Sequence, residues 1–446
     1  MADSTETSSS DDPNEPPTNV RFGVLGFLCV LAFIFYIDRI CIGQAAPKMR
    51  EDLGITKTQM GFVMAAFTLA YSLFEVPTGW WGDRYGSRGV MARIVVWWSV
   101  FTALTGAVLG LYSLMLVRFL FGAGEAGAFP NTARILSRWL PANRRGMAQG
   151  MVNSMAQLGG AVAPLLTAHC IERIGWRWTF VVFSVPGFAW VAAFYWWFRD
   201  DPATHPGVNA AELNLIHDGQ SVLAPVAHPP IPWRAVWSHL NVYLLGGVLA
   251  CTAFNTYFYF TWYPTYLKEG RGVVDSIESG KLGSLVLAGG AIGCLSGGFI
   301  IDWLLRRVSS RRWCRGLWGS FALTTASICL MVGVNCDDPS VAATWTAASV
   351  MMALSTLASW WGAVTDISGP HLGALFGLMN SMGGLGAIVS QLFVGPFVDW
   401  MEKRGFQGRA QWDPAFYVYA GVLLIGACGW LLIDSTKTIR GTDQTS

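Results

Sequence analysis

Apolar stretches, each about as long as a lipid bilayer's hydrocarbon core is thick, follow one another along almost the whole chain. Crossing that core takes roughly 20 apolar residues in a helix. Polar or charged residues separate one stretch from the next, so each stretch predicts one transmembrane helix. We expect an all-α membrane protein with twelve such helices, near residues 22–46, 59–81, 90–110, 112–136, 147–170, 178–198, 241–266, 281–304, 314–335, 342–364, 371–397 and 414–433.

One polar segment, rich in proline, divides these predicted helices into two groups of six. The first 20 residues are polar and acidic, which is typical of a disordered tail and unlike a signal or transit peptide. Lys and Arg gather in the loops on the side of the two termini, and the positive-inside rule assigns that side to the cytoplasm. The expected organisation is a cytoplasmic tail (1–20), a six-helix bundle (21–198), a cytoplasmic linker (199–240), a second six-helix bundle (241–434) and a C-terminal tail (435–446).

The composition agrees with a membrane protein and excludes several other classes. Only 13% of the residues are charged and 53% are hydrophobic, whereas soluble domains carry about 25% charged residues. A net charge of +2 without a long basic run gives no indication of nucleic-acid binding. The nine cysteines form no CxxC pair, and the sequence has no HExxH or GxSxG motif. We therefore expect no enzyme activity, no cofactor and no metal site.

The two groups of helices are related in sequence. Residues 150–159 (GMVNSMAQLG) and 377–386 (GLMNSMGGLG) share six of ten positions at an offset of 227 (377 − 150). The pattern Gly79-x-x-x-Asp83-x-x-x-x-Arg88 recurs from Gly298 at an offset of 219 (298 − 79). Two matches at nearly one offset predict a duplicated six-helix unit. Parallel repeats of this kind are typical of transporters whose substrate site lies between the repeats near the membrane midplane.

Several motifs resemble those of a known family of transporters. The segment GWWGDRYGSR (residues 79–88) resembles the signature loop of the major facilitator superfamily. The segments YIDR (36–39), RFLFGAGEAGAFP (118–130) and SRWLP (137–141) are similar to those of its anion:cation symporter family. That resemblance implies a transporter of organic anions such as sugar acids, hexuronates or aromatic acids. It also implies that Asp83, Arg84 and Arg88 act as a gate that controls alternation between states.

Four charged residues lie inside apolar stretches of the first half: Asp38, Arg39, Arg118 and Glu125. A charge at the bilayer centre costs about 2.5–3.5 kcal/mol on insertion scales, so each needs a partner or a polar cavity. Asp38 and Arg39 are neighbours that point roughly 100° apart on a helix, so they cannot simply pair with each other. Structural salt bridges between helices are the competing interpretation.

We interpret this cluster as a proton-coupled anion site. Burial raises the pKa of a carboxylate and a nearby arginine lowers it, so such an acid can titrate near the working pH. A proton on Asp38 or Glu125 would leave an arginine uncompensated and attractive to an anion, and by linkage the anion would favour the protonated acid. Arg39 is the predicted carboxylate ligand because guanidinium offers a bidentate fork. Arg118 is predicted to tune Glu125.

Polar residues of other predicted helices complete the expected site. Glu75 stands where a neutral amide is the commoner residue in the family that the motifs resemble. It is a further candidate for titration if it faces the cavity, and the alternatives are that it extends toward the membrane surface or pairs with an arginine of another helix. Asn255 with Tyr259, and Ser355 with Ser359, are i,i+4 pairs that could each share a face of the cavity. The additional substrate ligands that we predict are Tyr36, Tyr71, Asn255, Tyr259, Ser355, Ser359 and Asn380.

The function expected from the sequence is proton-coupled symport of an organic anion, most simply a sugar acid, by alternating access. A sodium-coupled or facilitative carrier of a dicarboxylate or aromatic acid is the alternative, and a non-transporting sensor is a third class. The predicted partners are a small organic anion, protons and the lipid bilayer, with no nucleic acid. We expect a monomer in a bacterial inner membrane, with both termini cytoplasmic.

Overall fold

The computed structural model describes residues 16–217, 233–308, 310–368 and 372–435, apart from the side chains of a few helical residues. Over this part the chain is helical, with no strand. The helices of the first half are α1 (Val20–Leu53), α2 (Lys57–Tyr85), α3 (Ser87–Thr105), α4 (Leu111–Glu125), α5 (Ala128–Trp139) and α6 (Ala142–Trp197). A 3-10 turn (Pro202–Thr204), α7 (Ala210–His217) and α8 (Trp233–Ser238) follow. The second half contains α9 (Leu240–Thr261), α10 (Tyr263–Glu269), α11 (Ser276–Arg307), α12 (Arg311–Asn335), α13 (Pro339–Leu354), α14 (Leu357–Ser368), α15 (Leu372–Lys403) and α16 (Arg409–Leu432).

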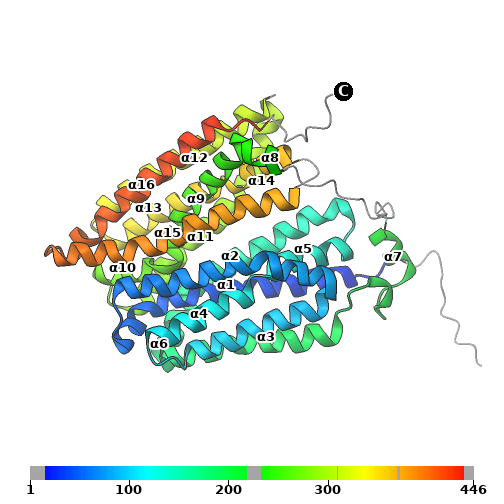
Figure 1. Ribbon diagram of the computed structural model, residues 1–446, viewed down its shortest axis with the longest axis horizontal. Coiled ribbons are helices and arrows are strands. Elements are labelled where there is room, and N and C mark those ends of the chain that lie inside the picture. Colours follow the sequence, from blue (N-terminus) through cyan, green and yellow to red (C-terminus); the bar gives the residue numbers. More distant parts are fainter. Residues whose placement is uncertain (1–15, 218–232, 309, 369–371, 436–446) are drawn as a thin grey trace, which may run out of the picture.

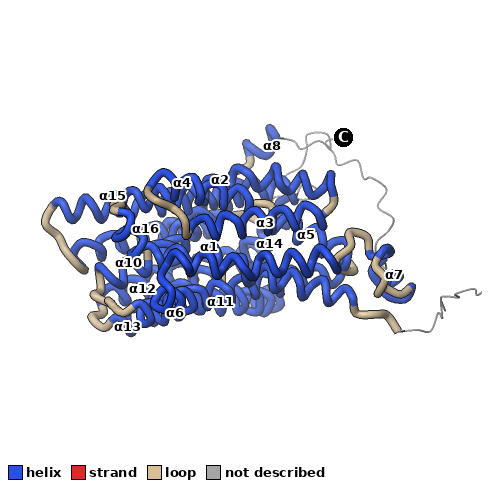
Figure 2. Tube along the Cα trace, turned by 90° about the horizontal axis from the view of Figure 1, so that it is seen from below, coloured by secondary structure: helices blue, strands red, loops and turns tan. Residues whose placement is uncertain are grey.

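The helices of each half pack mainly on one another and lie roughly parallel, so that the halves sit side by side (Figure 1). In the first half α1 packs on α6, α2 on α4 and α3 on α6. In the second half α9 packs on α15 and α16, and α12 on α13 and α16. Contacts of α2 with α15 and of α6 with α11 join the halves. Figure 2 shows α7 projecting beyond one end of the helices.

Eight helices of the described part are long and apolar enough to cross a membrane, so the protein is an integral membrane protein. The predicted number of twelve spans and the predicted domain boundaries stay predictions. Two predicted spans form one continuous element in α6, across a kink at Gly175 with φ 77°. Glycine tolerates this left-handed backbone because it has no Cβ.

Breaks in two helices occur at equivalent places in the halves. The break between α4 and α5 lies at Ala126–Gly127, and the break between α13 and α14 lies at Ser355–Thr356. The two breaks are 229 residues apart (355 − 126), close to the offset of 227 in the sequence match. The backbone interruptions therefore follow the duplication that the sequence predicts.

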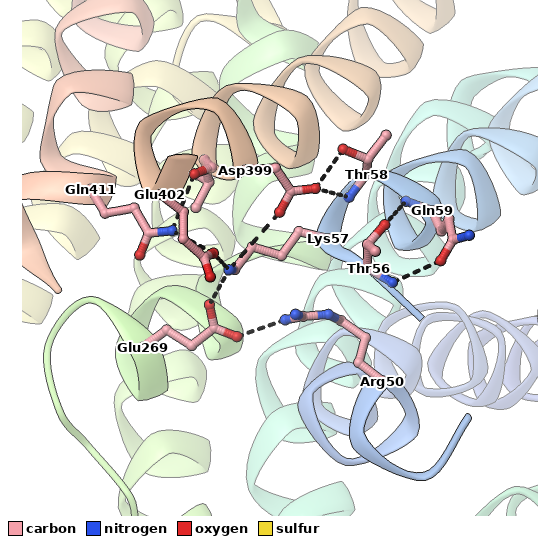
Figure 3. A network of polar contacts seen from close by, with 10 residues as sticks. Arg50, Thr56, Lys57, Thr58, Gln59, Glu269, Asp399, Glu402 and Gln411 are labelled. Atoms are coloured by element: carbon pink, nitrogen blue, oxygen red, sulfur yellow. Dashed lines mark hydrogen bonds and ion pairs between the residues drawn. The ribbon is translucent and has the colours of Figure 1, made fainter. Parts of the chain in front are cut away.

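Ion pairs join the halves at one end of their interface, the end at which Arg50 lies in the last turn of α1 (Figure 3). Lys57 of α2 pairs with Glu402 (2.5 Å), Glu269 (3.5 Å) and Asp399 (4.0 Å) of the second half. Arg50 at the end of α1 also pairs with Glu269, at 2.6 Å. In the described part of the chain, every ion pair between the halves lies here, and we call this region the closed end.

The line along which α2 meets α15, the α2–α15 seam, brings the two backbones very close. A Cβ on Gly395 would lie 2.5 Å from the carbonyl oxygen of Lys57, and one on Gly61 would lie 2.8 Å from that of Gln391. Thr68 donates a buried hydrogen bond from Oγ1 to Oε1 of Gln391, at 2.9 Å. Small residues and paired polar side chains are how helices pack closely within a membrane.

Candidate functional site

The centre of the site is an ion pair between α1 and α4. Arg39 donates from Nε to Oε1 of Glu125 at 3.3 Å, and the exposed fractions of the two side chains are 9% and 1%. Oε2 of Glu125 and Nη2 of Arg39 are buried without a hydrogen-bond partner. The pair therefore leaves polar atoms on both partners available to a ligand or a proton.

Asp38 lies on another side of α1, as its helical position requires. It is 1% exposed, lies near Trp98 of α3, and interacts electrostatically with Glu125 and Arg118. Neither carboxylate oxygen meets hydrogen-bond geometry with a partner, and Nε1 of Trp98 lies nearby as a donor that has no other acceptor. A buried acid without a partner is costly as an anion and cheap as a neutral acid.

Arg118 of α4 is also buried and only partly satisfied. Its side chain is 1% exposed, and Nε and Nη1 have no hydrogen-bond partner. The guanidinium lies over the ring of Phe121, 4.4 Å from the centroid, and 5.2 Å from that of Phe67. Among the described residues no carboxylate lies within ion-pair distance of Arg118. Arg118 interacts with Glu125 only at longer range, through electrostatic attraction, whereas Arg39 forms the ion pair with Glu125.

Aromatic rings surround the Arg39 guanidinium. Its carbon lies 4.6 Å from the centroid of Tyr71, 4.7 Å from Phe35, 5.2 Å from Phe67 and 5.6 Å from Tyr36. The negative faces of aromatic rings stabilise a desolvated cation, and Arg uses them more often than Lys. The structure thus brings the predicted ligands Tyr36 and Tyr71 together with Arg39.

Residues of both halves line a narrow cavity that includes the two arginines. The polar or aromatic residues that line it include Arg39, Arg118, Tyr257, Phe260 and Gln391, and the others are Ile42, Met64, Phe67 and Thr261. Its volume is about 10 Å³, which is room for about one water molecule. A molecule larger than water would enter only after the helices around the cavity move apart.

The helix α9 presents a different face to this cavity from the one that the sequence predicts. Asn255 and Tyr259 are buried, and the ring of Tyr259 packs on Phe258 and on Tyr263, 5.7 Å from the latter. Tyr257 lines the cavity instead and interacts electrostatically with Arg39. Residues two apart on a helix point about 200° apart, so Tyr257 and Tyr259 cannot share a face.

The predicted serines of the second half lie at the break between α13 and α14 and just after it. Ser355 is at the break between α13 and α14, where its Oγ donates to the carbonyl oxygen of Met352 at 2.7 Å. Ser359 of α14 is fully buried, and its Oγ has no partner. Neither residue lines the cavity. A serine near a helix break satisfies backbone groups locally, a use that its sequence spacing does not reveal.

The α2–α15 seam places two further polar residues beside the site. Nδ2 of Asn380 donates to Oε2 of Glu75 at 3.5 Å, across the two halves. Glu75 also interacts electrostatically with Arg39. Gln391, one of the cavity residues, was not among the residues that the sequence predicts for the site. Its polar position inside an apolar stretch was the available signal.

The predicted gating residues lie near the end of α2 and the start of α3. The side chain of Asp83 is outside the part of the structure that is described. Arg84 is exposed and lies over Tyr85, 5.7 Å from the ring centroid. Arg88 donates from Nε to the carbonyl oxygen of Tyr195 at 3.0 Å, within the first half. A gating role for the three residues stays a prediction.

Comparison with known proteins agrees with this architecture. The family model of the Major Facilitator Superfamily matches residues 28–391. A probable sulfoacetate transporter of Cupriavidus necator is 31% identical over 95% of this chain and 96% of its own length. A D-galactonate transporter of Escherichia coli is 31% identical over 94% of this chain and 96% of its own length.

The solved structures that are similar share the fold at low sequence identity. A bacterial homologue of the human lysosomal transporter Spinster, in an inward-facing and unoccupied conformation, superposes with a TM-score of 0.76 at 19% identity. The match covers 94% of this chain and 97% of the homologue. From the family model and these relatives, the chain belongs to the Major Facilitator Superfamily, alongside its organic-anion transporters.

Proposed function

We propose that the protein is a secondary active transporter that couples the movement of an organic anion to protons by alternating access. The observation that carries this proposal is the buried cluster of Asp38, Arg39, Arg118 and Glu125. In it, Arg39 and Glu125 form an ion pair, whereas Asp38 and Arg118 keep buried polar atoms without hydrogen-bond partners. A purely structural cluster would satisfy its charges fully, because unpaired buried charges are costly.

The coupling follows from competition for Arg39. While Glu125 is ionised, its carboxylate holds the guanidinium at 3.3 Å and keeps an external carboxylate away. A proton on Glu125 weakens that pair, and a substrate carboxylate then replaces it as the partner of Arg39. Asp38, which faces the same group of charges, carries a proton in the same way. Binding of anion and of proton therefore strengthen each other, because linkage is reciprocal.

The closed end gives this binding a direction. Because ion pairs of Lys57, Arg50 and Glu269 join the halves at this end, we infer that the site opens at the opposite end, where α1 begins and α16 ends. We assign that end to the cytoplasm of a bacterial inner membrane, so the structure corresponds to a state closed toward the outside. A monomer suffices for this cycle, since both halves of the site come from one chain.

A sugar acid is the substrate class that we infer. Relatives of similar identity are named as transporters of D-galactonate and, in Escherichia coli, as a probable galactarate/D-glucarate transporter. The tyrosines, Asn380 and Gln391 around the arginines are suitable partners for sugar hydroxyls. Thermal-shift measurements of the purified protein with aldonates, uronates, dicarboxylates and benzoates test this class, because a ligand stabilises the state that binds it. Stabilisation by benzoates alone would contradict it.

Sodium coupling is the second candidate, and one relative favours it. A chloroplast protein of Arabidopsis thaliana, named as a sodium-dependent phosphate transport protein, is 28% identical over 93% of this chain. Uptake into vesicles with sodium replaced by potassium, followed by addition of a protonophore, separates the two. Proton coupling predicts unchanged uptake in potassium and loss of accumulation with the protonophore. Sodium coupling predicts the reverse.

A further inference from the structure

Glu75 adds a third carboxylate to the group of charges around Arg39. In the proton-coupling scheme above, Asp38 and Glu125 are protonated when the substrate binds, so an ionised Glu75 together with Arg39 and Arg118 leaves a net charge of +1 (2 − 1). One substrate carboxylate neutralises that charge, whereas a second one would leave an excess of negative charge in this low-dielectric region. The proton-coupling scheme above uses Asp38 and Glu125 and assigns nothing to Glu75.

The α2–α15 seam holds Glu75 at the interface where a substrate would lie. Its Oε2 accepts a hydrogen bond from Nδ2 of Asn380, at 3.5 Å, across the halves. Tyr71, one turn earlier on α2, lies over the Arg39 guanidinium. Tyr257 of α9 lines the cavity and interacts electrostatically with both Arg39 and Glu75. Groups from α1, α2, α9 and α15 thus face the Glu75 carboxylate.

A dianionic sugar acid needs a place for its second carboxylate. Asn380 of the second half is a donor on the Glu75 side of Arg39, so it is a candidate partner for the far end of a substrate whose first carboxylate binds Arg39. Glu75 already occupies that donor with a carboxylate of its own. A second substrate carboxylate there would be repelled by the Glu75 carboxylate, and the Asn380 amide that could bind it would already be engaged.

We propose that Glu75 is a charge-selecting residue that restricts the site to substrates with one carboxylate. This inference rests on the proposed function as an organic-anion transporter. It goes further because the relatives are named for substrates of both kinds, with one carboxylate in galactonate and two in galactarate.

Uptake of D-galactonate and galactarate into proteoliposomes tests the inference, because the two acids share one carbon skeleton and differ by the second carboxylate. We expect wild-type protein to prefer galactonate by at least tenfold. Glu75→Gln keeps the shape and can still accept from Asn380, so we expect the preference to fall at least tenfold. Glu172→Gln is the control for the loss of a charge elsewhere. Glu172 is exposed, lies near the kink of α6 and does not line the cavity, so this variant should leave the ratio unchanged.

A second variant keeps the test decisive if Glu75→Gln does not fold. Asn380→Asp adds a carboxylate of the same shape beside Glu75, and we expect it to lower galactarate uptake relative to galactonate. A ratio that changes less than threefold in both variants overturns the role of Glu75 and leaves the proposed function standing. Failure of the wild-type protein to take up either acid contradicts the substrate class itself.

Discussion

At the scale of single residues, the account depends on what a guanidinium can do that an ammonium cannot. Arg39 pairs with Glu125 through one nitrogen and lies among four aromatic rings. Its planar group can hold two carboxylate oxygens and stack on rings at the same time, whereas lysine is a compact, strongly hydrated charge. The position is therefore sensitive to shape as well as to charge.

Arg39→Lys should weaken anion binding about tenfold or more, which corresponds to roughly 1.4 kcal/mol. The charge is kept, so the loss reports the bidentate geometry and the ring contacts. Calorimetric titration of the purified protein with galactonate measures it. Arg404→Lys is the matched control, because Arg404 also lies over a ring, that of Trp400, but outside the site. Equal affinity in Arg39→Lys and wild-type protein would remove Arg39 from the binding site.

At the scale of helices, close backbone contacts decide how the halves meet. Gly43 of α1 lies against α9, and a Cβ there would be 2.3 Å from the carbonyl oxygen of Phe260. A methyl group at this position would therefore force α1 and α9 apart. These helices must come together again in every transport cycle, when the closed end re-forms. Residue 43 must be glycine because α9 leaves no space for a Cβ, and not because its backbone has a positive φ.

Gly43→Ala should therefore slow transport at least tenfold while the protein still folds. Gly247→Ala on α9 is the control, since nothing lies within 4 Å of a Cβ at that position. Radiolabelled counterflow in proteoliposomes measures the exchange rate without a driving gradient. A Gly43→Ala protein that exchanges as fast as wild type would show that this contact does not limit alternation.

The segment after α6 docks on the first half and introduces a pH-sensitive group outside the membrane spans. His205 packs against Trp139 and Trp197, and its Nδ1 accepts a hydrogen bond from the backbone N–H of Gly207 at 3.1 Å. Burial and the positive charge of Arg199 lower the pKa of His205 from its ordinary value of 6.5. A protonated ring could not accept that bond.

The sign of the resulting pH dependence follows from linkage. Because the docked pKa is depressed, the docking contribution is complete above about pH 6.5 and is lost as the pH falls through the lowered value. Hydrogen exchange of residues 199–217, corrected for its intrinsic pH dependence, should be faster at pH 5.5 than at pH 7.5. His205→Gln should abolish that difference. Identical protection at both pH values in wild type would contradict this view of docking.

Much of this element-level picture could be predicted from the sequence, and the exceptions have physical causes. The buried charges were evident because Asp38, Arg39, Arg118 and Glu125 interrupt apolar stretches. The orientation of α9 was not, because an i,i+4 pair such as Asn255 and Tyr259 shares a face without revealing which face meets the cavity. The bond between Asn380 and Glu75 joins residues 305 apart, and a contact of that kind depends on how two separate helices pack.

At the scale of the whole molecule, ion pairs at the closed end hold the two halves together. Lys57 contacts three carboxylates, those of Glu269, Asp399 and Glu402. Without its positive charge these acids would repel one another, and the population with this end closed would decrease. A shift between two states needs only a difference in free energy of a few kcal/mol.

Lys57→Met should therefore speed hydrogen exchange in α10 several-fold, since α10 carries Glu269 at this end. Arg312→Met is the control, because Arg312 pairs with Asp434 near the C-terminal end of α16. Mass spectrometry of the two variants and wild type compares the same peptides. Unchanged protection of α10 in Lys57→Met would show that the network does not set the balance between states.

The most direct test of the central claim is uptake of galactonate into sealed proteoliposomes under an imposed pH difference. The account predicts accumulation above the external concentration when the proton gradient points inward, and none when it is absent. In the double variant Asp38→Asn/Glu125→Gln, we expect counterflow to persist and the response to the gradient to disappear. A wild-type protein whose uptake ignores the gradient, or a double variant that still accumulates galactonate, would contradict the coupling of anion and proton at these buried acids.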